Sequence, residues 1–92
     1  MSYYLKDPES RVDYAIDWLP YLGGETIAES VWTVAPIEEG GLAALHPRGD
    51  AWRTAANLEG GVAGHVYSVS NRVTLSNGSV EERSLCLRVE QR

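Results

Sequence analysis

The sequence has a single cysteine and no phenylalanine among its 92 residues. A lone Cys86 cannot form an internal disulfide, so packing or assembly must stabilise the fold. Because phenylalanine is absent, three tryptophans and five tyrosines must supply much of the bulk of the core. A chain of this length has room for one domain, which buries roughly 60–65% of the surface that its unfolded form exposes.

Long apolar runs and basic clusters are absent as well. The apolar runs span only a few residues, and Met1–Pro8 lacks a basic stretch followed by an apolar one. We therefore expect no membrane-spanning segment and no signal peptide. Eight Lys and Arg stand against thirteen Asp and Glu. Without a basic patch that contains aromatic side chains, we expect no binding of nucleic acid.

The charges are unevenly distributed along the chain. Residues 1–45 hold two basic and eight acidic side chains, whereas residues 46–92 hold six arginines and five acidic residues. An acidic first half and a near-neutral second half would favour head-to-tail contacts between copies. The alternative is an ordinary solvated acidic surface, because net charge bears on solubility and association rather than on fold.

Short runs between regular turn signals dominate what is present. Glycine pairs and an Asn-Gly step divide the chain at short intervals, which is typical of an all-β sandwich or barrel. No segment keeps a helical apolar period of 3.6 over three turns. Strands are predicted at residues 11–18, 26–35, 42–45, 52–58, 65–75 and 82–90, and Pro47 and Gly49 are expected to end the third.

The last two strands are the best defined. Residues 65–75 and 82–90 each alternate apolar and polar side chains, and Asn77-Gly78 stands between them. This dipeptide provides the positive φ angles of a type I′ turn and is the strongest short-range signal for a hairpin. We predict an antiparallel hairpin with its turn at Asn77-Gly78.

Tyr67 lies three residues after Gly64, at the start of the hairpin. Immunoglobulin-like sandwiches place a tyrosine here, and its hydroxyl bonds to upstream backbone; the alternative is an ordinary half-buried strand tyrosine. We predict an all-β fold, an immunoglobulin-like antiparallel β-sandwich of six to seven strands, with an SH3-like or other small barrel as the alternative. The residues expected to be mostly buried are Tyr14, Ile16, Trp32, Tyr67, Val69, Leu85 and Leu87.

Convergent titratable groups of the kind that an enzyme needs are scarce. Cys86 lies in the middle of a predicted strand, where a small buried hydrophobic residue is the default interpretation. His46 and His65 are too few for a zinc site, which usually has three or four Cys or His ligands. We predict no catalytic, cofactor-binding or metal-ligating residue, no cofactor and no enzymatic activity.

Three short features have a chemical and a structural interpretation. Asp13 and Asp17 share the polar side of the first strand, but calcium requires six to eight oxygen ligands. The tripeptide Arg48–Asp50 matches an integrin-binding motif and also fits an ordinary turn. Asn77–Ser79 matches a glycosylation acceptor, which we interpret as the hairpin turn because no secretion signal is expected.

A series of short segments is distinctive as an ordered set. They are Lys6-Asp7-Pro8, Asp13–Trp18, Glu25–Trp32, Leu58–Gly61, Gly64, Tyr67–Val73 and Glu82–Ser84. This set resembles a family of small structural proteins of tailed phages and prophages, often labelled fiber–tail adaptor or head–tail structural proteins. Pro47–Ala56 departs from the family because it lacks the usual Ser/Thr-rich run, and Ala56-Asn57 stands where larger apolar residues are usual.

This resemblance implies an immunoglobulin-like fold and a non-enzymatic structural role in a tailed-phage virion. The protein would be an adaptor or connector-associated protein that joins tail or head and fiber, or would decorate the particle. Its partners would be other virion proteins (tail, connector or fiber), with multiple copies in a symmetric assembly and no membrane contact. The alternative is a stand-alone binding module for carbohydrate or a host surface receptor, which exposed rings on one face of the sandwich would favour.

We divide the chain into an N-terminal arm, residues 1–10, and one sandwich domain, residues 11–92. Tyr3, Tyr4 and Leu5 precede the first predicted strand and have no evident core to enter. The arm is therefore a candidate docking segment, as are the loops within 36–50, because aromatic side chains are enriched in interface hot spots. Deletion of residues 1–8 would then leave the domain folded but prevent its incorporation into particles.

Overall fold

The alternating runs of the sequence become seven β-strands and one short 3₁₀ helix in the computed structural model, which describes residues 4–91. Within this part of the chain, no helix is long and apolar enough to cross a membrane. The elements in chain order are β1 (Tyr4–Lys6), β2 (Arg11–Asp17), η1 (Leu19–Tyr21), β3 (Ile27–Ala35), β4 (Leu42–Gly49), β5 (Arg53–Gly60), β6 (Val66–Leu75) and β7 (Val80–Val89).

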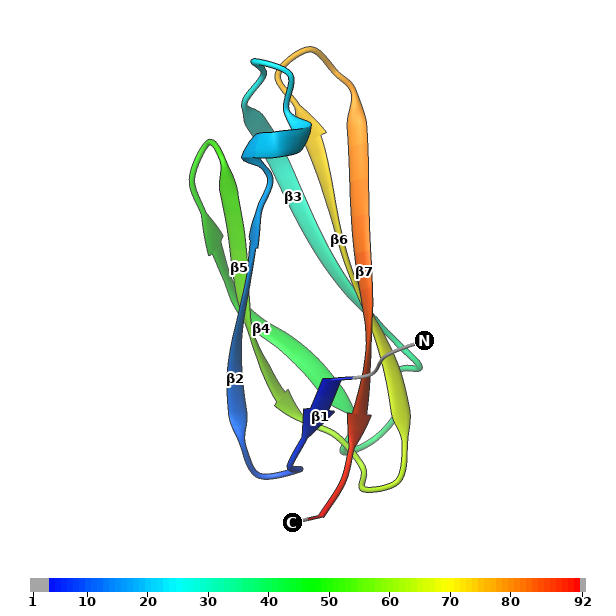
Figure 1. The fold of residues 1–92 in the computed structure, drawn as a ribbon. Helices are drawn as coiled ribbons and strands as arrows, with labels where there is room; N and C mark the ends of the chain where they lie inside the picture. The colour runs from blue at the N-terminus through cyan, green and yellow to red at the C-terminus, as the bar shows by residue number, and fades with distance from the viewer. Residues whose placement is uncertain (1–3, 92) are drawn as a thin grey trace.

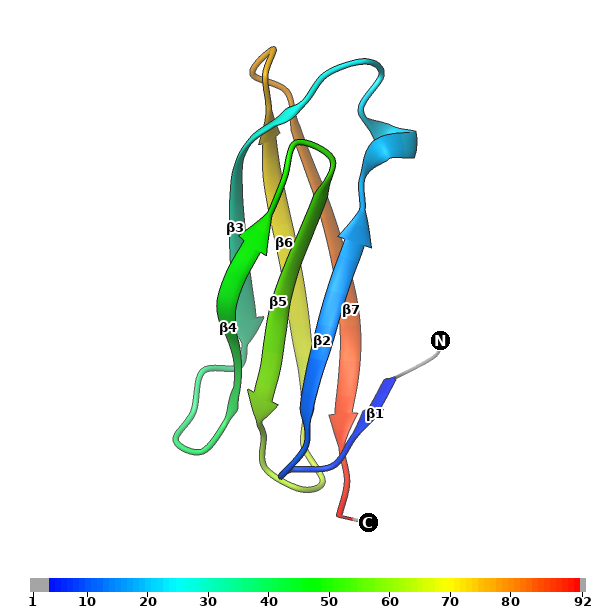
Figure 2. The ribbon, with the colours of Figure 1, turned by 90° about the vertical axis from the view of Figure 1, so that its left-hand side faces the viewer.

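The strands form two sheets that lie face to face (Figures 1 and 2). One sheet has the order β1-β7-β6-β3 and the other the order β2-β5-β4. Neighbours are antiparallel except β1, which lies parallel to β7. The predicted all-β sandwich of six to seven strands is confirmed, and residues 4–91 form seven strands. If β2 to β7 are lettered B to G, the sheets contain B-E-D and C-F-G, as in immunoglobulin domains; the immunoglobulin-like assignment beyond this strand order stays a prediction.

The predicted hairpin is confirmed, because β6 and β7 pair without a register shift from Val66 opposite Arg88 to Thr74 opposite Val80. Its turn differs from the predicted type I′. Gly78 has a φ of 90°, but Asn77 has no positive φ.

The hydrogen bonds of the turn explain this difference. The Gly78 N–H donates to the Leu75 carbonyl at 2.9 Å, and the Leu75 N–H donates to the Ser79 carbonyl at 2.7 Å. This is the pattern of a three-residue loop that ends in a left-handed glycine. The Asn77 side chain accepts the Ser79 N–H at 2.9 Å, so asparagine acts here through its oxygen rather than through its backbone conformation.

The prediction that Pro47 and Gly49 end the third strand was wrong, since β4 continues to Gly49. The register between β4 and β5 shifts between Leu45 and Arg48, and His46 has a φ of 53°. This bulge accommodates Pro47, which has no N–H to donate to the ladder. Beyond the bulge, the pairing with β5 resumes at Arg48 and Gly49. A Cβ added to Gly49 would collide with the Arg53 carbonyl oxygen.

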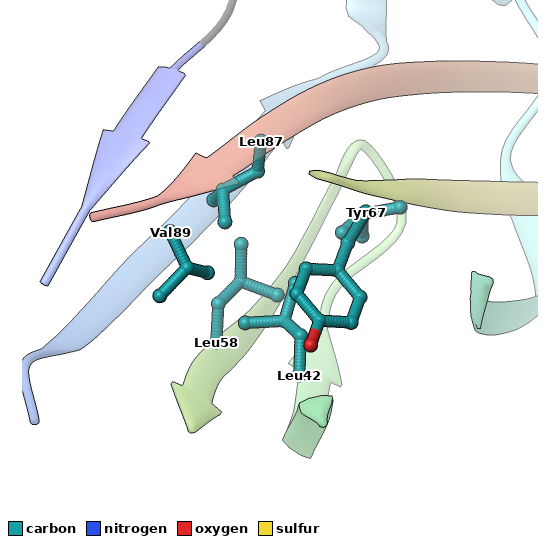
Figure 3. Close-up of a cluster of buried hydrophobic side chains, with 6 residues drawn as sticks. Leu42, Leu58, Tyr67, Leu87 and Val89 are labelled. Atoms are coloured by element: carbon teal, nitrogen blue, oxygen red, sulfur yellow. The ribbon is translucent and has the colours of Figure 1, made fainter. Parts of the chain in front are cut away.

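The core consists of two clusters between the sheets. One is formed by Leu42, Leu58, Tyr67, Val69, Leu87 and Val89 (Figure 3), and the other by Ile16, Trp18, Leu22, Val73 and Leu75. Of the predicted core residues, Ile16, Tyr67, Val69 and Leu87 are buried, whereas Tyr14, Trp32 and Leu85 are only partly buried. The largest fully buried side chain is Trp18, at 1% exposure.

A polar network crosses the core beside Trp18. The indole N–H of Trp18 lies 2.9 Å from the Thr54 hydroxyl and 3.2 Å from the Asn71 amide oxygen. The Thr54 hydroxyl donates to the same Asn71 oxygen at 2.6 Å. The Asn71 amide nitrogen donates to the Ser30 hydroxyl and the Val31 carbonyl. Because these groups come from both sheets, the network links the two layers and satisfies buried polar atoms that would otherwise be costly.

The bond predicted for Tyr67 is present, because its hydroxyl accepts the backbone N–H of Val62 at 2.9 Å. The chain reaches this point through Gly60 and Gly61, whose φ angles are 80° and 105°. A Cβ on Gly61 would lie 2.5 Å from a methyl group of the buried Val89. The Leu58–Gly61 segment is thus required for packing at the end of the sandwich.

Candidate interaction surface

Three residues with potential chemistry stand out in the sequence, namely Cys86, His46 and His65. Cys86, for which a small buried residue was the default interpretation, is only partly buried in β7. His46 lies at the exposed β4 bulge, and Nδ1 of His65 lies 2.7 Å from the Glu38 carboxylate. Residues 4–91 contain no group of three or more His, Cys, Asp or Glu that could hold a metal ion. The expectation of no cofactor and no catalytic residue stays a prediction.

The two aspartates of β2 have separate partners. The Asp13 carboxylate lies 3.3 Å from the Arg48 guanidinium on β4, in an exposed ion pair. The Asp17 carboxylate accepts the backbone N–H of Leu19 at 3.1 Å and so stabilises the start of η1. Each therefore has a structural contact of its own.

The tripeptide Arg48–Asp50 shapes the turn between β4 and β5. The Arg48 guanidinium donates to the His46 carbonyl at 3.0 Å and to the Asn57 amide oxygen at 2.9 Å. The Asp50 carboxylate accepts the N–H groups of Trp52 and Arg53 at 2.8 and 2.9 Å. These contacts support the interpretation of the tripeptide as an ordinary turn.

The hydrogen bonds of the Asp50 carboxylate should make the stability of the fold depend on pH. The two backbone N–H donors lower the pKa of Asp50. A carboxyl whose folded pKa is depressed contributes stability above its unfolded pKa, and that contribution is lost as pH falls through the folded pKa. Asp50→Asn should therefore be less stable than the natural protein near neutrality, with a difference in thermal midpoint that shrinks in acid. A direct NMR titration in which Asp50 titrates at or above the ordinary value for aspartate would contradict this.

Exposed large apolar side chains gather at one end of the sandwich, which we call the η1 end. Leu19 and Tyr21 on η1 are 58% and 53% exposed, and Trp52 in the β4–β5 turn is 51% exposed. The backbone N–H of Trp18 donates to the backbone carbonyl of Trp52 at 2.9 Å and joins the two segments. The Arg83 guanidinium lies 5.5 Å from the centre of the Tyr21 ring, which helps to hold that ring in place.

The opposite end, which we call the loop end, carries further exposed apolar side chains, on the β3–β4 loop at one edge and on β1 at the other (Figure 2). Ile37, in the loop between β3 and β4, is 96% exposed. Tyr4 and Leu5 on β1 are 62% and 51% exposed. Tyr3, which we also expected to dock, lies outside the described residues.

Part of the predicted N-terminal arm belongs to the sheet. Residues 4–6 form β1, which pairs with β7 from Tyr4 opposite Leu87 to Lys6 opposite Val89. Lys6 is buried, and its ammonium donates to the carbonyls of Asp7 and Gly60, both at 2.8 Å. Burial lowers the pKa of Lys6. The strand was missed because three residues are too short to show a period of two.

These observations define a small β-sandwich with apolar surface at both ends, a shape suited to contacts with other proteins. A protein-family profile described as podophage GP4 fiber-tail adaptor protein gp77 matches residues 6–88. The match covers nearly the whole chain, and the chain belongs to this family of phage structural proteins. The resemblance of the ordered segments is thereby confirmed. No curated protein matches the sequence.

Proposed function

We propose that this protein is a non-enzymatic adaptor that joins the tail of a podophage particle to its fibers, in several copies arranged symmetrically. The observation that carries the proposal is the pairing of a family match over residues 6–88 with two separated apolar ends. An adaptor must bind two different neighbours at once, and therefore needs two surfaces that do not overlap.

The side chains at the two ends fit this role. Tryptophan and tyrosine are enriched among the residues that dominate interface energies, and Tyr21 and Trp52 are both about half exposed at the η1 end. Tyr4 and Leu5 on β1 offer apolar surface at the loop end. Several identical fibers on one tail would need several copies of the part that attaches them, and such copies are usually related by closed symmetry.

The test is to make phage with substitutions at one end at a time. Leu19→Ser with Trp52→Ser alters the η1 end, and Tyr4→Ser with Leu5→Ser alters the loop end. Changes at the end that binds the fiber should give particles that retain the adaptor and lack fibers. Changes at the end that binds the tail should give particles that lack both.

A matched control is Val31→Ser, since Val31 is 53% exposed in the middle of β3, away from both ends. Its particles should carry both proteins in normal amounts, as judged by mass spectrometry and electron microscopy. Purified virions without this protein, or particles that hold their fibers in its absence, would overturn the proposal.

The binding-module alternative has less support. It would be favoured by exposed rings on one face of the sandwich. Trp18 is buried and Trp32 is partly buried, whereas Trp52 is exposed but lies in a turn at the end of the sandwich. No observation on the described residues favours a sugar-binding face over a contact with another protein.

A further inference from the structure

We infer that neighbouring copies of this chain bind each other head to tail, with the β3–β4 loop of one copy seated in a cleft of the next. The inference deepens the proposed function, on which it rests for the presence of several copies. Two features at opposite ends of the same edge carry it: a protruding apolar and acidic loop, and a cleft lined by aliphatic and charged side chains, among them Arg53.

The protruding feature is the tip of the loop at residues 36–41. Ile37 is 96% exposed, the highest value for any large apolar side chain in residues 4–91. Glu39 is also exposed and makes no salt bridge within those residues. An aliphatic side chain surrounded by solvent beside an unpaired carboxylate suits insertion into an apolar cleft with a cation at its rim.

The base of this loop is held by hydrogen bonds. The Gly41 N–H donates to the Glu38 carbonyl at 3.0 Å, and the Gly61 N–H donates to the Gly40 carbonyl at 3.1 Å. The Glu38 carboxylate lies 2.7 Å from Nδ1 of His65. These contacts anchor the backbone and leave Ile37 free to bind, so less conformational entropy is lost on association.

The receiving feature is a cleft at the far end of the same edge. It has a volume of about 470 Å³, in the range of pockets that hold small ligands. It lies between the start of β3 and the β4–β5 turn, and its lining is Ile27, Ala28, Ser30, Pro47, Arg48, Gly49, Asp50, Arg53 and Thr54. The cleft therefore offers aliphatic contacts as well as charge.

The cleft is lined by two arginines, Arg48 and Arg53, and one carboxylate, Asp50, whereas the loop holds Glu38 and Glu39. Arg48 already pairs with Asp13. Arg53 is attracted to the nearby Asp50 carboxylate, but it is exposed and makes no salt bridge within residues 4–91. With Ile37 in the cleft, we expect Glu39 to face Arg53 of the next copy, and such complementarity guides register and orientation.

The geometry favours a second copy as the occupant. β3 begins at the cleft and ends at the loop, and β4 returns from the loop to the cleft (Figure 2). One molecule cannot bring its two ends together, whereas each copy offers one loop and one cleft to its neighbours. Such a heterologous contact propagates and closes into a ring when the rotation between copies allows it.

A single loop gives a small interface, so the contact between two free chains should be weak. Ring closure and shared partners would strengthen it by raising the effective concentration. The experiment must therefore capture a transient contact between copies.

Disulfide trapping in the purified protein provides the test. In a Cys86→Ser background, Ile37→Cys and Ala28→Cys are introduced together, and the protein is oxidised at high concentration. We expect a ladder of covalent oligomers beyond the dimer on a non-reducing gel. The matched control combines Ile37→Cys with Glu82→Cys, because Glu82 is exposed on β7, in the same sheet as β3 but away from the cleft; it should give little product.

Charge reversal adds a second measurement. In the trapping background, Glu39→Arg or Arg53→Glu alone should lower the yield of oligomers about tenfold at equal protein concentration, because each places like charges together. The double variant should restore the yield. Products that stop at the dimer, a control pair that forms an equal ladder, no ladder, or a double variant that is not restored would each overturn the inference.

These outcomes are separable from those of the proposed function. A protein that forms the ladder but is absent from virions retains this interface and loses the adaptor role. A protein found between tail and fiber without the ladder retains the role and loses the interface.

Discussion

Replacing Trp18 by alanine is expected to remove most of the stability of the domain. Trp18 is the largest fully buried side chain, packed with Ile16, Leu22 and Val73 in one core cluster. Truncation of a buried tryptophan costs about 3–5 kcal/mol, because contacts are lost and a cavity remains. Domains of this kind hold roughly 5–15 kcal/mol in total, so the variant should be partly unfolded at moderate temperature.

The measurement is the midpoint of chemical denaturation, followed by far-UV circular dichroism, which does not depend on tryptophan fluorescence. Trp18→Phe separates packing from hydrogen bonding: it keeps a ring in the core but removes the donor to Thr54 and Asn71, for an expected cost of roughly 1–3 kcal/mol beyond the loss of volume. Trp52→Ala is the matched control, because Trp52 is half exposed and surface changes usually stay within about 0.5 kcal/mol. A midpoint for Trp18→Ala equal to that of the control would contradict the prediction.

The sequence correctly predicted the sandwich but placed Trp32 rather than Trp18 among the key core residues. The reason lies in the sheet order. Trp32 is on β3, an edge strand, so one side of its ring lacks a neighbouring strand. The Tyr14 ring packs against it at a centroid distance of 5.9 Å, but Trp32 stays only partly buried. Trp18 lies just past the end of β2, and β5 and β6 cover it from both sheets. Alternation shows which face a residue is on, but not how many strands surround it.

The candidate surface was predictable only in part. The loops within 36–50 were expected to dock, and Ile37 in that range is nearly fully exposed. Leu19 and Tyr21 were missed, although they flank Pro20 between a predicted strand and a glycine pair. Apolar residues in such a turn have little chance to enter a core, and this signal could have marked them. The cleft with Arg53 could not be predicted, because it depends on the position of β3 beside the β4–β5 turn.

Deletion of residues 1–8 is now expected to destabilise the domain, in contrast to the expectation from sequence. The deletion removes β1 and its pairing with β7. It also removes the buried Lys6 ammonium, which donates to the Gly60 carbonyl at 2.8 Å, and the Lys6 carbonyl, which accepts the Glu90 N–H at 2.9 Å. Hydrogen bonds to charged groups contribute about 1.5–3 kcal/mol and backbone bonds about 1 kcal/mol, so a total loss of about 3 kcal/mol is expected.

A fall in the denaturation midpoint of the deletion variant, reproduced in part by Lys6→Met, would support this account. Lys6→Met keeps the strand and the aliphatic stem but loses the two carbonyl contacts of the ammonium. An unchanged midpoint in the deletion variant would show that β1 adds nothing to the fold.

Docking by this segment needs a separate variant, because an unstable deletion variant could fail to assemble through unfolding as well as through loss of a docking contact. Tyr4→Ser with Leu5→Ser provides it, because both side chains are exposed while the β1 backbone and Lys6 remain. If this variant folds normally and still enters particles in normal amounts, β1 serves only the fold; if it folds normally and is excluded, β1 is part of the virion interface.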